Sequence, residues 1–393
     1  MFHLSLPLDP MKTGRAAEVL ESNLRKRIIG QNEAIQHIVN IYQMYLTGMT
    51  PPNRPIGNFL FLGPTGSGKT RTVEAAAESL LGTARAVIKI DCAEFQHSHE
   101  IAKLIGSPPG YLGHRETHPL LSQEVLNQYQ SEQVKLSFVL FDEIEKASDA
   151  LWNLLLGVLD KATLTLGDNR RVDFSKTMIF LTSNLGAQEM GSILKPKMGF
   201  TSFDSAQPPN SPDASDKLNA KVARSGMEAA RMKFTPEFMN RLDKTVVFKS
   251  LGQVELRQIL DIELGLVQQR IFDSAGVNSF VFTLSSSAKD HLLKEGTDMK
   301  YGARHLKRAI ERILVQPLSN LIATEQVHGG DWVRMDFSEE LNRATFLKEA
   351  EGLPVHAMAE MAGESVTLPA SATAGTPVAE PARAAGARSS RRI

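Results

Sequence analysis

Cysteine is nearly absent from this sequence. The 393 residues include one cysteine, Cys92, which excludes an intramolecular disulfide and a metal cage built from cysteines. A chain with so few thiols suits a reducing compartment, so we predict a cytoplasmic protein. Cys92 itself is expected to be a small buried residue rather than a reactive thiol.

The sequence also lacks net charge, because 44 basic residues balance 44 acidic ones. No overall field would attract nucleic acid or an anionic membrane, and neither is an expected partner, although this sum says nothing of local patches. No apolar run approaches eighteen residues, and the first ten residues lack the basic and apolar regions of a signal peptide. We therefore expect a soluble chain without a membrane segment.

Short apolar runs alternate with amphipathic stretches through the first 250 residues. A chain of 393 residues exceeds one usual hydrophobic core, so two or more domains are expected. Helices alternating with buried strands predict an α/β fold with a doubly wound parallel sheet flanked by helices. The predicted strands are residues 59–62, 86–90, 137–141, 177–183 and 245–248.

The clearest motif follows the first of these strands. Its glycines allow successive backbone N–H groups to point at one anion, and a helix expected over residues 70–81 adds its positive N-terminal end. We expect Lys69 to reach the β and γ phosphates of a nucleotide and Thr70 to hold Mg²⁺. We prefer this interpretation to the alternative, a glycine-rich turn on the surface with no such role. The residues that match the P-loop pattern G-x-x-x-x-G-K-[ST] are Gly63, Pro64, Thr65, Gly66, Ser67, Gly68, Lys69 and Thr70.

Two further strands end in polar residues. Asp142 and Glu143 follow the four apolar residues 138–141, and Asn184 follows residues 177–183. Carboxyl ends of parallel strands meet where open α/β sheets bind ligands, so these residues should lie near the P-loop. We expect Asp142 to bind Mg²⁺ through water and Glu143 to polarise the water that attacks the γ-phosphate.

Two loops carry apolar side chains among glycines. Residues 106–113 hold Tyr111, which either packs on the core or is presented to grip a substrate. Residues 191–216 are rich in Gly, Pro and Ser and are expected to form a long mobile insertion. Within it, Met198-Gly199-Phe200 is either local packing, which we favour, or a docking peptide.

The pattern changes near residue 250. Helices expected over 253–272, 285–295 and 303–323 mix with short strands at 279–283, 332–337 and 344–347. Beyond Gly352 the chain is rich in Ala, Pro, Ser and Thr, which is typical of disorder. The expected organisation is a lead-in at 1–22, a large P-loop domain at 23–249, a small α+β domain at 250–349 and a disordered tail at 350–393.

Residues 21–348 resemble the C-terminal ATPase ring of the Clp unfoldases and disaggregases, which are AAA+ proteins. A P-loop alone is common, whereas an ordered set of motifs is specific. Besides the P-loop, the motifs that carry the resemblance are Ile28-Ile29-Gly30-Gln31, Pro52-Asn-Arg-Pro-Ile-Gly57, Gly110-Tyr-Leu-Gly113, Phe141-Asp-Glu-Ile-Glu-Lys-Ala147, Thr182-Ser-Asn-Leu-Gly186, Pro236-Glu-Phe-Met-Asn-Arg-Leu-Asp243 and Tyr301-Gly-Ala-Arg304.

The resemblance implies roles at matching positions. Ile28 and Ile29 would line the adenine pocket, and Asn184 would sense the γ-phosphate. Arg241 would be an arginine finger reaching a neighbouring subunit's ATP, and Arg304 a second sensor that contacts nucleotide and ties its state to the angle between domains.

The resemblance also implies an assembly. A finger supplied in trans requires a closed ring, and family membership implies six subunits. Tyr111, with Leu112, would be the pore-loop residue that grips polypeptide, and residues 166–171 would form the second pore loop. The long family form has an N-terminal domain, a first ATPase ring and, in disaggregases, a middle domain; none fits here, so a stand-alone ring is expected.

The function implied is an ATP-driven unfoldase that threads unfolded or misfolded polypeptide. The alternative is an AAA+ switch or loader acting on a folded complex or nucleic acid without threading. Balanced charge and the aromatic loop favour threading, since a nucleic-acid motor would need a basic pore. A third possibility, a nucleotide-binding scaffold that does not hydrolyse ATP, is disfavoured because the residues expected to carry out hydrolysis are all present: Glu143, Asn184, Arg241 and Arg304. A barrel peptidase docking at Met198-Gly199-Phe200 is a further hypothesis.

Overall fold

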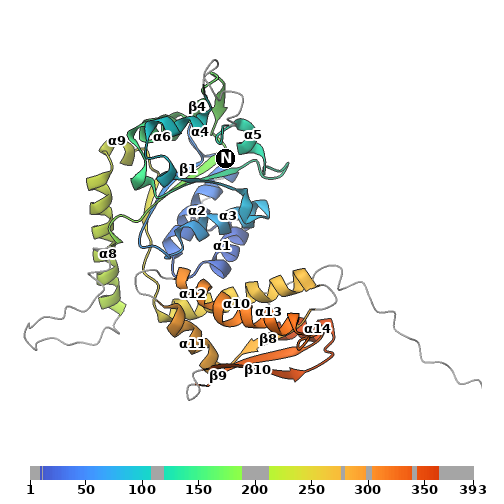
Figure 1. The fold of residues 1–393 in the computed structure, drawn as a ribbon. Coiled ribbons are helices and arrows are strands. Elements are labelled where there is room, and N and C mark those ends of the chain that lie inside the picture. The colour runs from blue at the N-terminus through green and yellow to red at the C-terminus, as the bar shows by residue number, and fades with distance from the viewer. Residues whose placement is uncertain are drawn as a thin grey trace, which may run out of the picture. The chain divides into compact units, whose positions relative to one another are not determined.

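The computed structural model describes residues 9–10, 12–107, 119–187, 212–275, 279–297, 303–338 and 343–362 (Figure 1). Its contacts divide the chain into two compact units. One unit comprises Met1–Ile259 together with Gly296–Arg308, and the other comprises Leu260–Glu295 and Ala309–Ile393.

A five-stranded parallel sheet forms the centre of the first unit, with strand order β2-β3-β6-β1-β7. All five predicted strands are confirmed. Because β1 lies beside β6, and β6 beside β3, the carboxyl ends of these three strands meet at one edge of the sheet. The strands are β1 Gly57–Leu62, β2 Val87–Asp91, β3 Ser137–Asp142, β6 Thr177–Ser183 and β7 Lys244–Val247.

Helices cover both faces of this sheet. Along β1, Phe59 and Phe61 belong to one buried cluster, and Leu60 and Leu62 belong to the other. Strands buried on both faces need no polar alternation, which explains the continuous apolar runs. The first cluster includes α1 Arg15–Arg27, α2 Asn32–Leu46 and α3 Lys69–Leu81; the second includes α6 Asp149–Lys161, α8 Pro212–Lys233 and α9 Pro236–Met239.

The sequence around residues 120–130 also predicts a helix, but in the structure it is shorter, and α5 spans only Gln123–Asn127. The amide of Leu121 donates to the Leu104 carbonyl, so the residues before Ser122 are hydrogen-bonded to the end of α4 Ala102–Ile105 and are not part of the helix. The Ser122 hydroxyl then accepts from the Val125 amide at 3.3 Å and caps the helix start. The other short elements here are η1 Ala84–Ala86, η2 Cys92–Glu94, η3 Ser98–Ile101, α4 Ala102–Ile105, η4 Ile144–Lys146 and the antiparallel pair β4 Thr163–Thr165 and β5 Arg171–Asp173.

The second unit contains a three-stranded sheet in the order β10-β9-β8, with β8 parallel and β10 antiparallel to β9. The predicted helix at 303–323 is present, with a π-helical turn at Glu311–Val315 before Pro317, a residue that has no N–H to donate. The remaining elements of this part of the chain are α10 Gln253–Ala275, β8 Val281–Leu284, α11 Ser286–Gly296, α12 Ala303–Ile310, α13 Gln316–Ala323, β9 Trp332–Ser338 and β10 Arg343–Ala350. The start of α10, up to Ile259, and most of α12, up to Arg308, belong to the first unit.

The prediction of disorder beyond Gly352 is wrong for one segment. A helix, α14 Val355–Ala362, follows β10. Its Met358 is buried against Phe272 and Val281, so an apolar helical face supplies the packing that overall composition did not reveal. The predicted insertion also ends early, since residues 212–216 lie in α8; residues 191–211 lie outside the described part of the chain.

Cys92 is fully buried, as predicted. Burial raises the pKa of its thiol, and the neighbouring carboxylates of Asp91 and Asp142 act in the same direction. The thiolate, which is the reactive form, is therefore strongly disfavoured. In the described part of the chain, no helix has the length and apolar character needed to cross a membrane. The cytoplasmic location stays a prediction.

Candidate active site

The P-loop leaves β1 in a conformation that its glycines make accessible. Gly63 has φ +146°, and a Cβ there would lie 2.8 Å from the Phe248 carbonyl oxygen. Gly66 and Gly68 have φ of 78° and 99°, which L residues rarely adopt. The Gly63 amide donates to the Ser183 carbonyl at 3.2 Å, so the start of the loop is tied to β6.

Lys69 lies inside this loop and is only 7% exposed. Its Nζ donates to the carbonyl oxygens of Gly63 and Pro64, at 2.7 and 3.0 Å, and to Asn184 Oδ1 at 2.9 Å. Burial lowers the pKa of Lys69 to about 8, although the carboxylates of Asp142, Glu145 and Glu143 oppose that shift. A buried cation of this kind is stabilised by an added anion.

The acidic pair lies at the end of β3. Asp142 accepts a hydrogen bond on Oδ1 from the Thr182 hydroxyl of the adjacent β6. Glu143 has φ +56°, so the chain leaves the strand direction at this residue. Its carboxylate accepts from Asn184 Nδ2 at 3.2 Å and pairs with Lys146 Nζ at 2.5 Å.

Asn184 connects the loop with the acidic pair. Its side chain accepts from Lys69 and donates to Glu143, while its backbone amide donates to Glu145 Oε1 at 3.1 Å. The structure thus brings together three residues that the sequence singled out after three separate strands: Lys69 after β1, Glu143 after β3 and Asn184 after β6. Glu145 and Thr182 also belong here and were not predicted; the third carboxylate of the sequence Asp-Glu-Ile-Glu was the available signal for Glu145.

These residues fit bound Mg-ATP. A Cβ on Gly68 would meet nothing within 4 Å, so the left-handed turn before α3 borders open space, and the buried Lys69 charge lies beside it. Proteins usually bind Mg²⁺ through one or two carboxylates together with substrate phosphates, and Asp142 supplies a carboxylate near the P-loop. The residues would be Thr70 and Asp142.

The segment predicted to line the adenine pocket reaches the P-loop through a residue that sequence reasoning missed. Ile28 is buried in the core and Ile29 is half-buried. The buried Gln31 donates from Nε2 to the carbonyls of Ser67 and Lys249, at 3.1 and 3.0 Å, and accepts from the Lys249 amide at 3.1 Å. The glutamine therefore links this segment to both the P-loop and the end of β7.

Arg241 follows α9 and occupies a separate place in the first unit. Its guanidinium pairs with Glu237 at 3.0 Å and lies 3.9 Å from Asp160. Its carbonyl accepts from Asn58 Nδ2 and Arg54 Nη2, at 3.1 and 3.3 Å. Within the described chain, no hydrogen bond or ion pair of this side chain reaches Lys69 or the acidic pair. Its backbone is anchored to β1, the strand that carries the P-loop.

Arg304 lies at the start of α12, which begins at the P-loop. The Ala303 amide donates to the Gly66 carbonyl at 3.3 Å, and the positive charge of Arg304 contributes to lowering the pKa of Lys69. The predicted pore-loop residues Tyr111 and Leu112, and the tripeptide Met198-Gly199-Phe200, lie outside the described residues.

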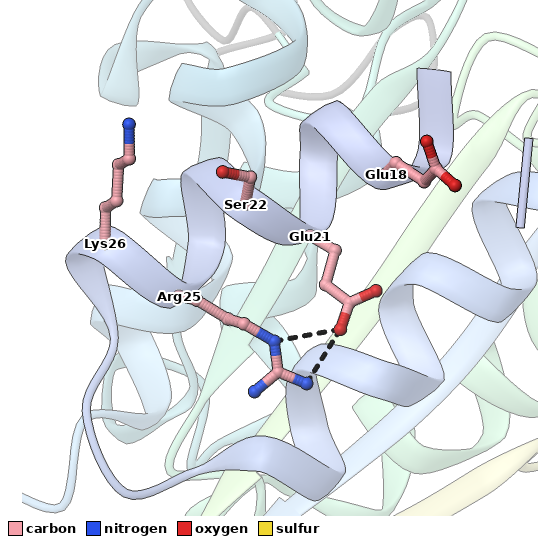
Figure 2. Close-up of a pocket in the computed structure, with 5 residues that line it drawn as sticks. All are labelled: Glu18, Glu21, Ser22, Arg25 and Lys26. Atoms are coloured by element: carbon pink, nitrogen blue, oxygen red, sulfur yellow. Dashed lines mark hydrogen bonds and ion pairs between the residues drawn. The ribbon is translucent and has the colours of Figure 1, made fainter. Parts of the chain in front are cut away.

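A shallow hollow on α1 is unrelated to these residues. Glu18, Glu21, Ser22, Arg25 and Lys26 line it, and Arg25 pairs with Glu21 at 2.7 Å (Figure 2). None of the predicted site residues faces this hollow.

Comparison with known proteins agrees with the fold and the motif order. The model of an AAA domain of the Cdc48 subfamily matches residues 54–245, and that of the C-terminal D2-small domain of ClpB matches residues 251–335. The chaperone protein ClpB of Bdellovibrio bacteriovorus is 38% identical over 332 residues, which are 84% of this chain and 35% of that protein. The chain belongs to the Clp-type AAA+ family.

Other similar proteins are of the same kind. The ClpB of Rhodopseudomonas palustris is 37% identical over 330 residues, covering 84% of this chain and 34% of the relative. A closed-state cryo-EM reconstruction of Hsp104 with ATPγS and FITC-casein has a TM-score of 0.66 and 28% identity, covering 84% of this Clp-type chain and 51% of the Hsp104 chain. The chain spans about a third of the length of the ClpB relatives it matches.

The lowered pKa of Lys69 predicts that nucleotide affinity depends on pH. Bound phosphate favours the charged amine. The affinity for nucleotide is therefore highest well below pH 8 and falls as the pH rises through 8. Between pH 7.5 and 9.0 the Kd for ADP should rise by roughly tenfold, as titration with a fluorescent ADP would measure. Lys69→Arg, whose guanidinium stays charged, should show no such rise. An equal rise in both proteins would contradict the assignment.

Proposed function

We propose that this chain hydrolyses Mg-ATP. The observation that carries the proposal is the continuous hydrogen-bonded connection from Lys69 through Asn184 to Glu143, at 2.9 and 3.2 Å. It joins a phosphate-binding cation, a residue able to sense phosphate and a carboxylate able to act as a base. This arrangement suits phosphoryl transfer, where catalysis consists mainly of positioning and charge stabilisation.

Each side chain has a defined part in the reaction. Bound Mg²⁺ would neutralise charge on the β and γ phosphates. Thr70 would hold it directly and Asp142 through water. Lys69 exchanges its carbonyl partners for phosphate oxygens. Glu143, oriented by Asn184, positions the attacking water and accepts its proton.

Arg241 and Arg304 act on charge that develops during transfer. A guanidinium is a fixed planar cation, which suits it to stabilise negative charge on a phosphoryl group during its transfer. Arg241, held away from its own Lys69, is proposed to reach the nucleotide of a neighbouring subunit, in a closed ring of six copies. Arg304, at the P-loop end of α12, is proposed to act on the nucleotide of its own subunit.

Hydrolysis is proposed to drive the threading of an unfolded or misfolded polypeptide through the ring. The residues on either side of the predicted Tyr111 loop support this. The Leu120 amide, which follows the loop, donates to the carbonyl of Lys103, which precedes it, so the two ends of the loop lie side by side. The Gly167 amide of the β4–β5 hairpin donates to the Ile105 carbonyl at 2.8 Å. The two proposed pore loops therefore share a base. The similarity to an Hsp104 reconstruction with FITC-casein points to the same kind of substrate.

The contact between these loops requires glycine. A Cβ on Gly167 would lie 2.5 Å from the Gly106 carbonyl oxygen, so no larger residue fits without a shift of the backbone. The base of the hairpin is therefore packed directly against the start of the proposed Tyr111 loop.

The proposed function is tested by ATP turnover with and without an unfolded protein such as casein. Casein should stimulate wild type, Tyr111→Ala should lose the stimulation while keeping basal turnover, and Tyr111→Phe should retain it because the aromatic grip remains. Equal stimulation of the Ala variant would refute a gripping role for Tyr111, and no turnover in wild type would refute the ATPase itself.

A barrel peptidase remains a proposed partner through the apolar-Gly-Phe tripeptide at 198–200. Co-elution with such a peptidase should disappear in Phe200→Ala. Binding that survives this substitution would exclude the tripeptide as the docking element.

A further inference from the structure

Thr182 occupies the penultimate position of β6 and is 1% exposed. Its hydroxyl makes two hydrogen bonds to the end of β3. It donates to Asp142 Oδ1 and accepts from the Glu143 amide at 3.1 Å. One buried side chain thus contacts both members of the acidic pair, from the neighbouring strand.

The second of these bonds explains how Glu143 holds its conformation. Glu143 has φ +56°, a left-handed conformation in which a residue with a side chain is rarely found. Its amide lies beyond the end of β3 and would lose this partly buried hydrogen bond if the hydroxyl were removed. The Thr182 hydroxyl supplies the acceptor for this amide, and the carboxylate of Glu143 can then meet Asn184 at 3.2 Å.

The first bond fixes the other acidic residue. A hydroxyl that donates to Oδ1 of Asp142 restricts rotation of the carboxylate and leaves Oδ2 to accept from water. Outer partners of this kind commonly determine the orientation of groups that act on a metal. The same hydroxyl has lone pairs left for the Glu143 amide, so the two bonds are compatible.

We infer that Thr182 is a positioning residue that sets both the Mg²⁺-directed carboxylate of Asp142 and the backbone of the proposed base Glu143. The inference rests on the proposed ATP hydrolysis. Thr182 does not touch nucleotide in this account; it acts through the acidic pair. Coupling both residues to β6 also places them in register with Asn184, two residues further along the same chain segment.

A purely structural role for Thr182 would be to fill the core and satisfy buried polar atoms. Thr177 provides the matched comparison, because it is also 1% exposed and begins the same strand, at the end opposite the acidic pair. Removing either hydroxyl should affect stability, but only Thr182 should affect the response to Mg²⁺.

The test compares Thr182→Val, which keeps the shape and loses the hydroxyl, with Thr182→Ser, which keeps the hydroxyl, and with Thr177→Val. Binding of a fluorescent ADP is titrated with Mg²⁺ from an EDTA-treated start, and kcat and KM for ATP are measured in parallel. Thr182→Val should raise the Mg²⁺ concentration at half-effect by about 10- to 100-fold and lower kcat more than it changes KM. Thr182→Ser and Thr177→Val should follow wild type in their Mg²⁺ response.

Two results would overturn the inference. One is a Mg²⁺ response and kcat in Thr182→Val equal to those of Thr177→Val. The other is a Thr182→Ser variant as impaired as Thr182→Val, since the methyl group would then be the important part. Thr182→Ala serves the same comparison if the Val variant does not fold. Wild type without any Mg²⁺-dependent nucleotide binding would instead refute the proposed function.

Discussion

Glu143→Gln is expected to lower kcat for ATP hydrolysis by about 10²- to 10³-fold while the affinity for ATP stays close to that of wild type. The amide cannot accept the proton of the attacking water, yet it keeps the size of the carboxylate and an oxygen for Asn184 Nδ2. Phosphate binding depends on Lys69 and the glycines, which the substitution leaves in place. Steady-state hydrolysis and fluorescent-nucleotide binding measure the two effects separately.

Glu145→Gln is the matched control for this substitution. Glu145 contacts the Asn184 amide through Oε1, and glutamine retains an acceptor there, so the loss of kcat should remain within about tenfold. Equal losses in the two variants would mean that local negative charge, rather than a base at Glu143, governs the rate. Normal turnover in Glu143→Gln would remove this residue from the catalytic role.

Arg241→Ala is expected to reduce turnover by roughly 10³-fold, the lower end of the effect of an arginine finger. Nucleotide binding should be kept, because no hydrogen bond of the guanidinium reaches the P-loop within the described residues. The side chain is 22% exposed and already paired with Glu237, so part of its charge is available for a neighbouring subunit. Hydrolysis rate and nucleotide affinity, measured on one preparation, give the comparison.

Mixing variants decides whether the finger acts in trans. Lys69→Ala subunits lack a working P-loop but carry Arg241, whereas Arg241→Ala subunits carry the intact P-loop. Mixed rings contain interfaces where both intact parts meet, so activity should exceed that of either variant alone. Glu237→Gln, which removes the partner of Arg241 without touching the finger, serves as a control and should remain active. Mixtures as inactive as their components would place Arg241 in its own subunit's chemistry.

Much of this arrangement was predictable from the sequence because the signals are local. The apolar runs before Gly63 and Asp142 predicted buried strands, and the structure confirms both. The P-loop spacing predicted the turn into α3, and polar residues after Leu181 predicted where Asn184 would lie. In each case a short stretch determines both the local structure and its place at the edge of the sheet.

The remaining features depend on contacts between distant segments. Gln31 reaches the backbone of Lys249, 218 residues away, and Thr182 in β6 reaches Glu143 at the end of the neighbouring strand β3. Neither role is visible in the local spacing of residues along the sequence. The helix Val355–Ala362 follows from apolar packing on β8, which composition averaged over the tail conceals. Tyr111 stays a prediction from sequence alone.

The most direct measurement is the fluorescence of a folded β-barrel protein carrying an unstructured tail, followed with the chain, Mg²⁺ and ATP. The proposed function predicts a steady loss of fluorescence with ATP, with none in the Glu143→Gln variant. Vigorous ATP hydrolysis by wild type with constant fluorescence would contradict coupling of hydrolysis to polypeptide threading.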